Sequence, residues 1–186
     1  MKFLKWILII LTALGLLLYF VGWPYMKEQT KKNSPEKTVT YNKNGYNLSV
    51  TYSSPSKKGR DIFGQLVPYD TVWRTGANEP TTFTTATDIR IFDEVLPSGT
   101  YSLWTKPGKK KWSVMFNSDI PDWGVTILSG GKETTRIPSK DVITVEIPSE
   151  KIDEVTENFT IGFLYQDQLY MYLAWDRTKV KIPFNY

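Results

Sequence analysis

Residues 159–175, FTIGFLYQDQLYMYLAW, give the clearest indication of the fold. Two apolar rows alternate with other residues on either side of the polar Gln166-Asp167-Gln168. The first row is Phe159, Ile161, Phe163 and Tyr165, and the second is Leu169, Met171, Leu173 and Trp175. Successive side chains of a β-strand point to opposite faces of the sheet, so each row predicts a strand with one apolar, inward face.

The same alternation extends in both directions from this stretch. Further strands are predicted at residues 46–52, 81–87, 89–91, 100–105, 112–117, 142–147 and 180–184. Turn residues separate them, notably Pro97-Ser98-Gly99, Pro107-Gly108 and Gly130-Gly131, and residues 100–117 read as a hairpin. Strands spaced by 8–12 residues predict an all-β, antiparallel β-sandwich or jelly-roll-like domain, with no helix expected after residue 26.

The N-terminal residues show a different pattern. Residues 6–23 (WILIILTALGLLLYFVGW) contain no charge, and an 18-residue helix is about 27 Å long, enough to span a bilayer. We therefore predict a membrane anchor over 1–26, a flexible polar stalk over 27–37 and an all-β exported domain over 38–186. A cleaved signal peptide is the alternative for 1–26, although small residues are missing from the end of the apolar run.

The lysines on the two sides of this run are nearly balanced, so they do not fix its orientation. The short segment before it favours a single-pass membrane protein with the C-terminal domain exported. The membrane is thus one expected partner, contacted through residues 6–23.

Composition excludes several chemistries. The chain has neither histidine nor cysteine, which rules out a Ser-His-Asp triad, a cysteine nucleophile and nearly all zinc or copper sites. We expect no metal site and no cofactor. The net charge is only +4, and the longest basic run is Lys109-Lys110-Lys111, so no nucleic-acid partner is expected.

Residues 54–80 (SPSKKGRDIFGQLVPYDTVWRTGANEP) do not alternate, and long irregular stretches in compact domains are often functional. The candidate ligand-binding residues are Arg60, Asp70, Arg74, Asn78 and Glu79 here, together with Trp123 farther along the chain.

Two interpretations of this loop remain open. In the structural one, Arg74 and Glu79 form an ion pair across a turn, and Arg74→Ala should cost more than about 2 kcal/mol. In the functional one, Arg74, Asn78 and Glu79 form the polar floor of a pocket, where an arginine suits a carboxylate. Asp70 and Glu79 could also act as an acid–base pair.

Of the seven tryptophans, Trp104 and Trp123 adjoin turn residues and are the ones expected to be exposed.

Several strings in the chain resemble one family. Val72 to Glu79 (VWRTGANE), Leu96 to Leu103 (LPSGTYSL), Asp122-Trp123-Gly124 and Trp175 to Val180 (WDRTKV) look like motifs of domain-of-unknown-function family 2911. Its members are mostly exported bacterial proteins. The resemblance implies an exported domain and supplies no reaction, ligand or catalytic residue.

The preferred hypothesis is a non-catalytic binding or interaction module on the bacterial cell envelope. The sequence does not identify its ligand or protein partner, for which a glycan and a small carboxylate are the candidates. One alternative is a carboxylate-dependent, hydrolase-like enzyme centred on Asp70, Arg74 and Glu79. The other is a purely structural envelope component. A cavity lined by the polar groups of residues 54–80 would favour the first two over the third.

Overall fold

The computed structural model describes residues 2–126 and 128–185, so Met1, Ile127 and Tyr186 lie outside the described residues. It divides into a helical unit that ends at Asn33 and an all-β unit that begins at Ser34. Each unit is described by itself below.

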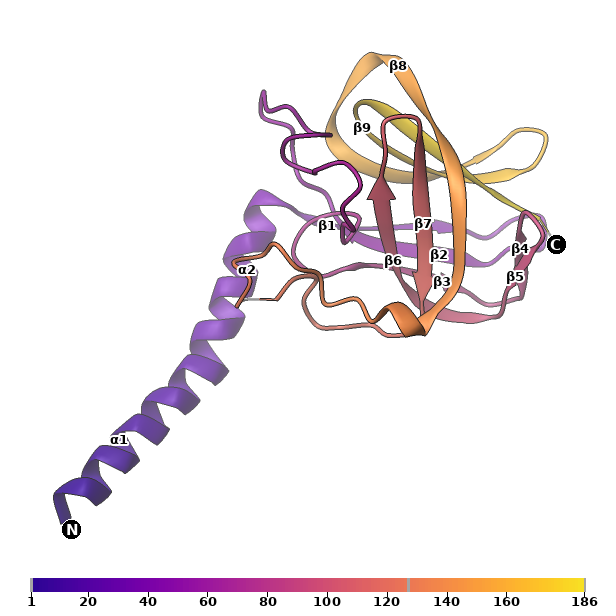
Figure 1. The fold of residues 1–186 in the computed structure, drawn as a ribbon. Helices are drawn as coiled ribbons and strands as arrows, with labels where there is room; N and C mark the ends of the chain where they lie inside the picture. Colours follow the sequence, from indigo (N-terminus) through magenta and orange to yellow (C-terminus); the bar gives the residue numbers. More distant parts are fainter. Residues whose placement is uncertain (1, 127, 186) are drawn as a thin grey trace. The chain divides into compact units, whose positions relative to one another are not determined.

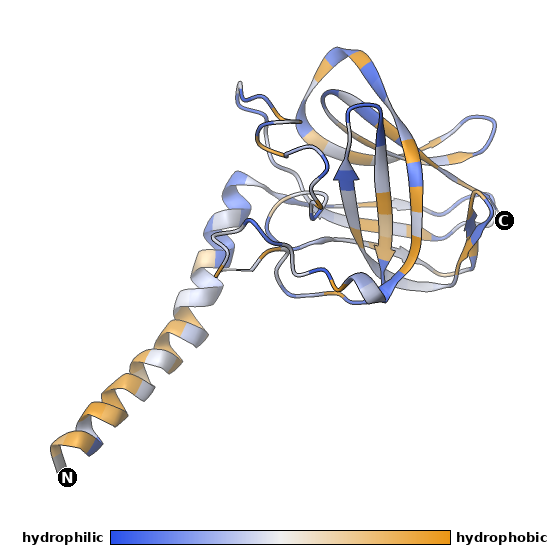
Figure 2. Cartoon of the chain, viewed as in Figure 1, coloured by the Kyte–Doolittle hydropathy of each residue, from blue (hydrophilic) through white to orange (hydrophobic). Residues whose placement is uncertain are grey.

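The helical unit contains α1 (Lys2–Leu17), the π-helical turn η1 (Leu18–Gly22) and α2 (Trp23–Asn33). Figure 2 shows that apolar residues cover α1 and give way to polar ones along α2. The helix Phe3–Asn33 has 31 residues and a mean hydropathy of 2.3 in its most apolar part. It is long and apolar enough to cross a membrane, a property that an N-terminal signal sequence shares.

The π-helical turn ends at Gly22, two residues before Pro24, and Trp23 donates its backbone N–H to the carbonyl of Leu18. Proline has no N–H to donate, and its ring crowds the carbonyl four residues earlier. Widening the preceding turn is a common way to continue a helix past such a residue.

The structure differs from the expected polar stalk over 27–37. Helix α2 continues to Asn33, and strand β1 (Glu36–Tyr41) begins three residues later. Lysine, glutamate and glutamine are good helix formers, so a polar stretch that follows an existing helix extends it at little cost.

The β unit is dominated by one sheet of seven strands in the order β1-β2-β3-β6-β7-β8-β9, with all neighbours antiparallel (Figure 1). After β1 the strands are β2 (Leu48–Ser53), β3 (Thr81–Thr85), β6 (Gly99–Pro107), β7 (Lys111–Asn117), β8 (Asp141–Tyr165) and β9 (Leu169–Phe184). A small hairpin of β4 (Ile89–Ile91) and β5 (Glu94–Leu96) and the 3-10 turn η2 (Pro138–Lys140) complete the unit. The prediction of an antiparallel all-β domain after an N-terminal helix is confirmed.

The sheet is strongly curled because its last two strands are long and bent. The predicted strands 142–147 and 159–165 are parts of β8, and β9 joins residues 169–175 to 180–184. Register shifts between Lys151 and Thr160 mark the bend of β8, and bulges of this kind increase strand twist and curvature.

The curl brings the end of β8 over β2. The Tyr52 hydroxyl donates to the carbonyl of Ile161 at 3.4 Å, and the Ser54 hydroxyl donates to that of Phe159 at 2.7 Å. Burial from water raises the pKa of Tyr52. Strands from the two ends of the sheet therefore face each other across one core.

Most residues of the inward rows predicted from the sequence fill this core, but Tyr165, at the end of β8, is 53% exposed. Fully buried members include Val50, Phe83, Val114, Phe116, Phe159, Met171, Val180 and Phe184. Trp104 was expected to be exposed and is instead 0% exposed. It lies on the outer face of β6, where its Nε1 donates to Ser102 Oγ at 2.7 Å. The Ser102 hydroxyl also bonds to the carbonyl of Asp119, so the connection between β7 and β8 covers this face.

Candidate ligand-binding cavity

The irregular residues before β3 form an ordered turn fixed to β6. Trp73 exchanges both backbone hydrogen bonds with Thr105, at 2.7 and 3.0 Å, and its indole Nε1 donates to the carbonyl of Gly76 at 2.9 Å. Thr75 and Asn78 adopt positive φ values of 56° and 61°. A Cβ at Gly76 would lie 2.9 Å from the carbonyl oxygen of Ser53, so only glycine fits there.

The connection between β7 and β8 meets this turn. Gly124 donates its N–H to the carbonyl of Asn78 at 3.2 Å, and a Cβ at position 124 would lie 2.3 Å from Cδ of Arg74. The Thr135 hydroxyl donates to the carbonyl of Trp123 at 2.6 Å, which ties the returning part of the connection to the same place. Segments some 50 residues apart in the sequence thus build one wall.

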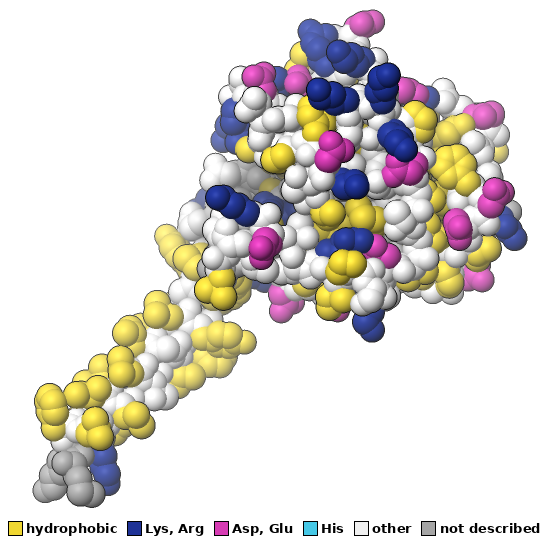
Figure 3. Space-filling model, in the orientation of Figure 1, with side chains coloured by type: hydrophobic (Ala, Val, Ile, Leu, Met, Phe, Trp, Pro, Cys, Tyr) yellow, Lys and Arg dark blue, Asp and Glu magenta, His cyan; other side chains and the backbone are white. Residues whose placement is uncertain are grey.

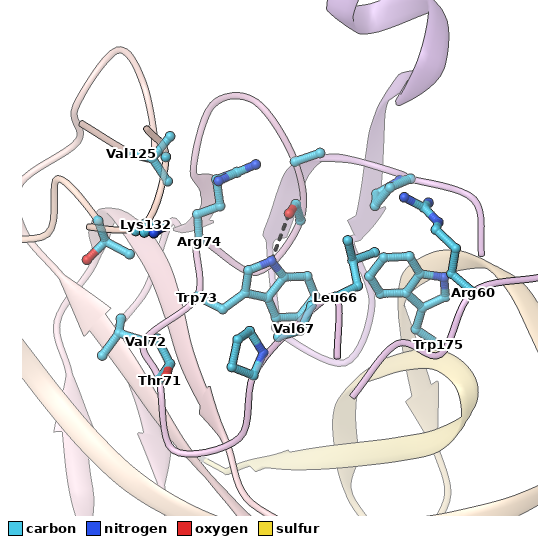
Figure 4. A pocket seen from close by; sticks show the side chains of 16 residues that line it. Arg60, Leu66, Val67, Thr71, Val72, Trp73, Arg74, Val125, Lys132 and Trp175 are labelled. Atoms are coloured by element: carbon cyan, nitrogen blue, oxygen red, sulfur yellow. Dashed lines mark hydrogen bonds between the residues drawn. The ribbon is translucent and has the colours of Figure 1, made fainter. Parts of the chain in front are cut away.

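A cavity of about 570 Å³ opens between these segments, within the range typical of small-molecule sites. It is lined by Pro55, Arg60, Leu66, Val67, Pro68, Thr71, Val72, Trp73, Arg74, Gly76, Ala77, Val125, Gly131, Lys132, Thr134 and Trp175 (Figure 4). Three of these residues are basic, and none of the described residues that line the cavity is acidic.

Arg74 is the most buried of the three basic residues that line the cavity. Among the described residues, its buried Nε has no hydrogen-bond partner, and its side chain belongs to no ion pair. Burial lowers the pKa of Arg74 from its ordinary value, because the charged form loses hydration. Among the ion pairs of the described residues, none joins Arg74 to Glu79, contrary to the structural interpretation. Gly124 lies against the arginine stem and leaves its guanidinium at the cavity.

Arg60 lies across the cavity from Arg74, with Trp73 and Leu66 between them (Figure 4). Its own loop orients it, because Nε donates to the carbonyl of Lys57 at 2.9 Å and Nη2 to that of Ser56 at 2.6 Å. Lys132 adds a third positive charge from the other wall. The cavity is cationic as a result.

The apolar side of the cavity rests on packed aromatic rings. Trp73 stacks on Trp175 with centroids 6.0 Å apart and an interplanar angle of 16°, and Phe159 meets Trp73 edge-on at 5.0 Å. Both indole N–H groups already have acceptors, since Trp175 Nε1 donates to the carbonyl of Glu157 at 3.2 Å. The rings supply a rigid apolar wall and no free donor.

Of the predicted site residues, Arg60 and Arg74 line the cavity. The others do not. Asp70 is exposed, and its backbone N–H donates to the carbonyl of Pro107. Asn78 is buried and accepts at its carbonyl from Gly124, so it supports the turn. Glu79 and Trp123 are partly buried outside the lining.

Sequence reasoning missed Trp175, Lys132, Val125 and Thr134 as lining residues. The only local signal for the last three is the Gly130-Gly131 turn, whose glycines have φ values of 63° and 83°. Nothing in the sequence indicates that this turn lies close to Arg74 in the folded protein.

Charge elsewhere on the surface is mixed. Figure 3 shows basic and acidic side chains interspersed over the visible face of the β unit, without a continuous basic stripe. Within residues 2–126 and 128–185, no group of three or more carboxylates is placed to hold a metal ion.

The fold and the cavity define an all-β domain with a cationic small-molecule-sized site, preceded by one apolar helix. The family model described as "Protein of unknown function (DUF2911)" matches residues 34–184, and the chain belongs to this family. The match begins where the β unit begins. No curated protein and no solved structure matches the chain.

Proposed function

We propose that this protein is a membrane-anchored, non-catalytic binding module whose cavity holds a small molecule with a carboxylate or a similar anionic group. The observation that carries the proposal is Arg74, a desolvated guanidinium at a cavity wall with no acceptor at its buried Nε among the described residues.

Such an arrangement costs folding free energy. A buried polar group without a partner is unfavourable by roughly 1–3 kcal/mol, and more when it is charged. Binding sites commonly retain groups of this kind because the ligand supplies the missing partner. A carboxylate matches the arginine fork with two parallel hydrogen bonds, and Arg60 and Lys132 add attraction for the same anion.

The enzyme alternative has less support, because it requires two carboxylates and none is found among the described residues that line the cavity. Asp70 and Glu79 are absent from the described lining. A purely structural role gives no reason for the buried Nε of Arg74, which has no hydrogen-bond partner among the described residues.

We also propose that the apolar helix is an uncleaved anchor and that the β unit is exported to the cell envelope. The charge-free run at residues 6–23 and the short segment before it support this topology. Protease added to intact spheroplasts should remove the β unit. Protection of the unit until the membrane is lysed would reverse the topology, and a mature N-terminus beyond residue 15 would indicate a cleaved signal.

Ligand binding can be tested with the full chain in a non-ionic detergent. Acetate, hexanoate, gluconate and phosphate are added as sodium salts at constant ionic strength, and the melting temperature is measured. At least one anion should raise it in the wild type and not in Arg74→Met. Arg90→Met, which removes an exposed arginine of β4 outside the cavity lining, is the matched control and should respond like the wild type. Equal responses of all three proteins would contradict the proposal.

A further inference from the structure

We infer that the ligand is an amphiphilic anion, with a carboxylate at Arg74 and an apolar body against the aromatic wall, and that it is not a sugar. This inference rests on the proposed function and names the class of molecule that the same cavity takes.

The hydrogen-bonding capacity of the lining carries the inference. Arg60, Arg74 and Lys132 are donors only. The side-chain acceptors among the described lining residues are the hydroxyls of Thr71 and Thr134, because no Asp, Glu, Asn or Gln is present. Every sugar hydroxyl has a proton to donate as well as lone pairs. A buried hydroxyl without an acceptor is unfavourable, so this set of side chains suits a ligand that only accepts.

The packing of the aromatic rings also argues against a sugar ligand. Sugar rings are usually held on an open indole face, but Trp73 has Trp175 stacked on it and Phe159 packed against it. Trp175 is itself only 2% exposed. These rings therefore present little free face to a sugar ring.

The remaining wall suits an alkyl or aryl group. Leu66 lines the cavity and is 44% exposed, and Val67, Val72 and Val125 adjoin the same space. Figure 4 places Leu66 between the two arginines, beside the indole of Trp73. An apolar body covering Leu66 would remove this surface from water while its carboxylate lies at Arg74.

Four small ligands test the inference in the full chain in a non-ionic detergent, with dissociation constants taken from the rise in melting temperature. They are butanoate, hexanoate, gluconate and hexanamide. Each methylene buried should strengthen binding about fourfold, so hexanoate should bind roughly fifteenfold more tightly than butanoate. Gluconate, which has the six carbons of hexanoate and five hydroxyls, should bind at least tenfold more weakly than hexanoate. Hexanamide lacks the charge and should also bind more weakly.

The outcomes separate the two proposals. Gluconate binding as tightly as hexanoate, with both responses lost in Arg74→Met, would overturn the inference and leave the proposed function standing. Hexanamide binding as tightly as hexanoate would overturn the requirement for an anion. If no anion gives a response that depends on Arg74, the proposed function itself fails.

A matched pair of variants tests the apolar wall. Leu66 and Val95 are both 44% exposed, but Val95 belongs to β5 and does not line the cavity. Leu66→Ala should weaken hexanoate binding by roughly threefold to tenfold and leave acetate binding unchanged. Val95→Ala should change neither. Equal effects of the two substitutions on hexanoate binding would contradict the proposed position of the ligand's apolar body at Leu66.

Discussion

Gly124 is packed directly against the side-chain stem of Arg74: a Cβ at position 124 would lie 2.3 Å from Cδ and 2.9 Å from Cβ of the arginine. The same glycine donates its N–H to the carbonyl of Asn78. The connection between β7 and β8 thus fixes the position of Arg74, whose guanidinium makes no ion pair of its own among the described residues.

Gly124→Ala should therefore displace Arg74. Overpacking of this kind costs about 1–3 kcal/mol, and anion binding should weaken with it. Gly162→Ala is the control, because its added methyl meets the Tyr172 side chain at 2.5 Å, away from the cavity. Urea melts and hexanoate titrations of both variants provide the measurement. Binding lost in Gly162→Ala and kept in Gly124→Ala would contradict this assignment.

Arg74→Met should leave the free energy of unfolding unchanged or raise it by about 1 kcal/mol, because it removes a desolvated charge and keeps most of the stem. The pKa of Arg74 is lowered in the folded state, so its charged form opposes folding throughout the neutral range. A loss above 2 kcal/mol in urea melts would restore the structural interpretation.

Arg136→Met gives the contrasting case. Arg136 holds Asp141 through two nitrogens, and both side chains are largely buried. Asp141 would keep only the amide of Asn117 as a side-chain partner among the described residues. We expect a loss of about 3 kcal/mol in the same urea melts. An unchanged free energy of unfolding would show that an ion-paired arginine contributes no more to the stability of this domain than Arg74 does.

Much of the fold could be predicted from the sequence because strand alternation is a local property. Rows such as Trp112, Val114 and Phe116 lie in the core as expected. The continuity of β8 was not predictable, since its bend depends on pairing with β9 rather than on a local breaker. Strand β1 was missed because its EKTVTY segment is largely exposed at the sheet edge and lacks an apolar row.

The site was predictable only in part. The arginines of residues 54–80 were found because charged groups among glycines and prolines mark a non-regular segment. Asn78 follows Arg74 by only four residues, yet it is buried outside the cavity lining, and its backbone carbonyl accepts from Gly124. Lys132 and Trp175 reach the cavity through the fold of distant segments, which spacing along the chain does not reveal.

A pH dependence is expected from Glu146. Hydrogen bonds from Lys111, at 2.7 Å, and from the opposite Ser113 lower the pKa of this carboxyl from its ordinary value of 4.5. The ionised carboxylate thus favours the folded state above pH 4.5, and this contribution disappears as the pH falls through the lowered value. The site is exposed, so the contribution should stay below about 1 kcal/mol.

Urea melts of wild type and Glu146→Gln at pH 7, 5 and 3 test this dependence. The difference in unfolding free energy should be largest at pH 7 and vanish at low pH. Glu94→Gln, an exposed position on β5, serves as the reference. A difference that grows on acidification would contradict the sign of the pKa shift.

The β unit should fold without the helix, provided that it begins at Ser34. Ser34 is buried, the Pro35 carbonyl accepts from the N–H of Ser54 at 2.9 Å, and Glu36 pairs with Ser53. Residues 34–186 should show a β-type circular dichroism spectrum and one unfolding transition. Starting at Lys37 removes these contacts and should cost about 1–2 kcal/mol. Equal stability of the two proteins would show that Ser34 to Glu36 contribute nothing.

The central claim, that the cavity binds an anion through Arg74, is tested most directly by the NMR signal of the Arg74 Nε–H group during a hexanoate titration of the full chain. Arg74→Met assigns the signal by removing it. Arg136 Nε, which already donates to Asp141 at 3.0 Å, is the internal reference and should not move. A new charge-assisted hydrogen bond should shift the Arg74 proton downfield in a saturable way. An unchanged Arg74 signal at hexanoate concentrations that raise the melting temperature would contradict the account.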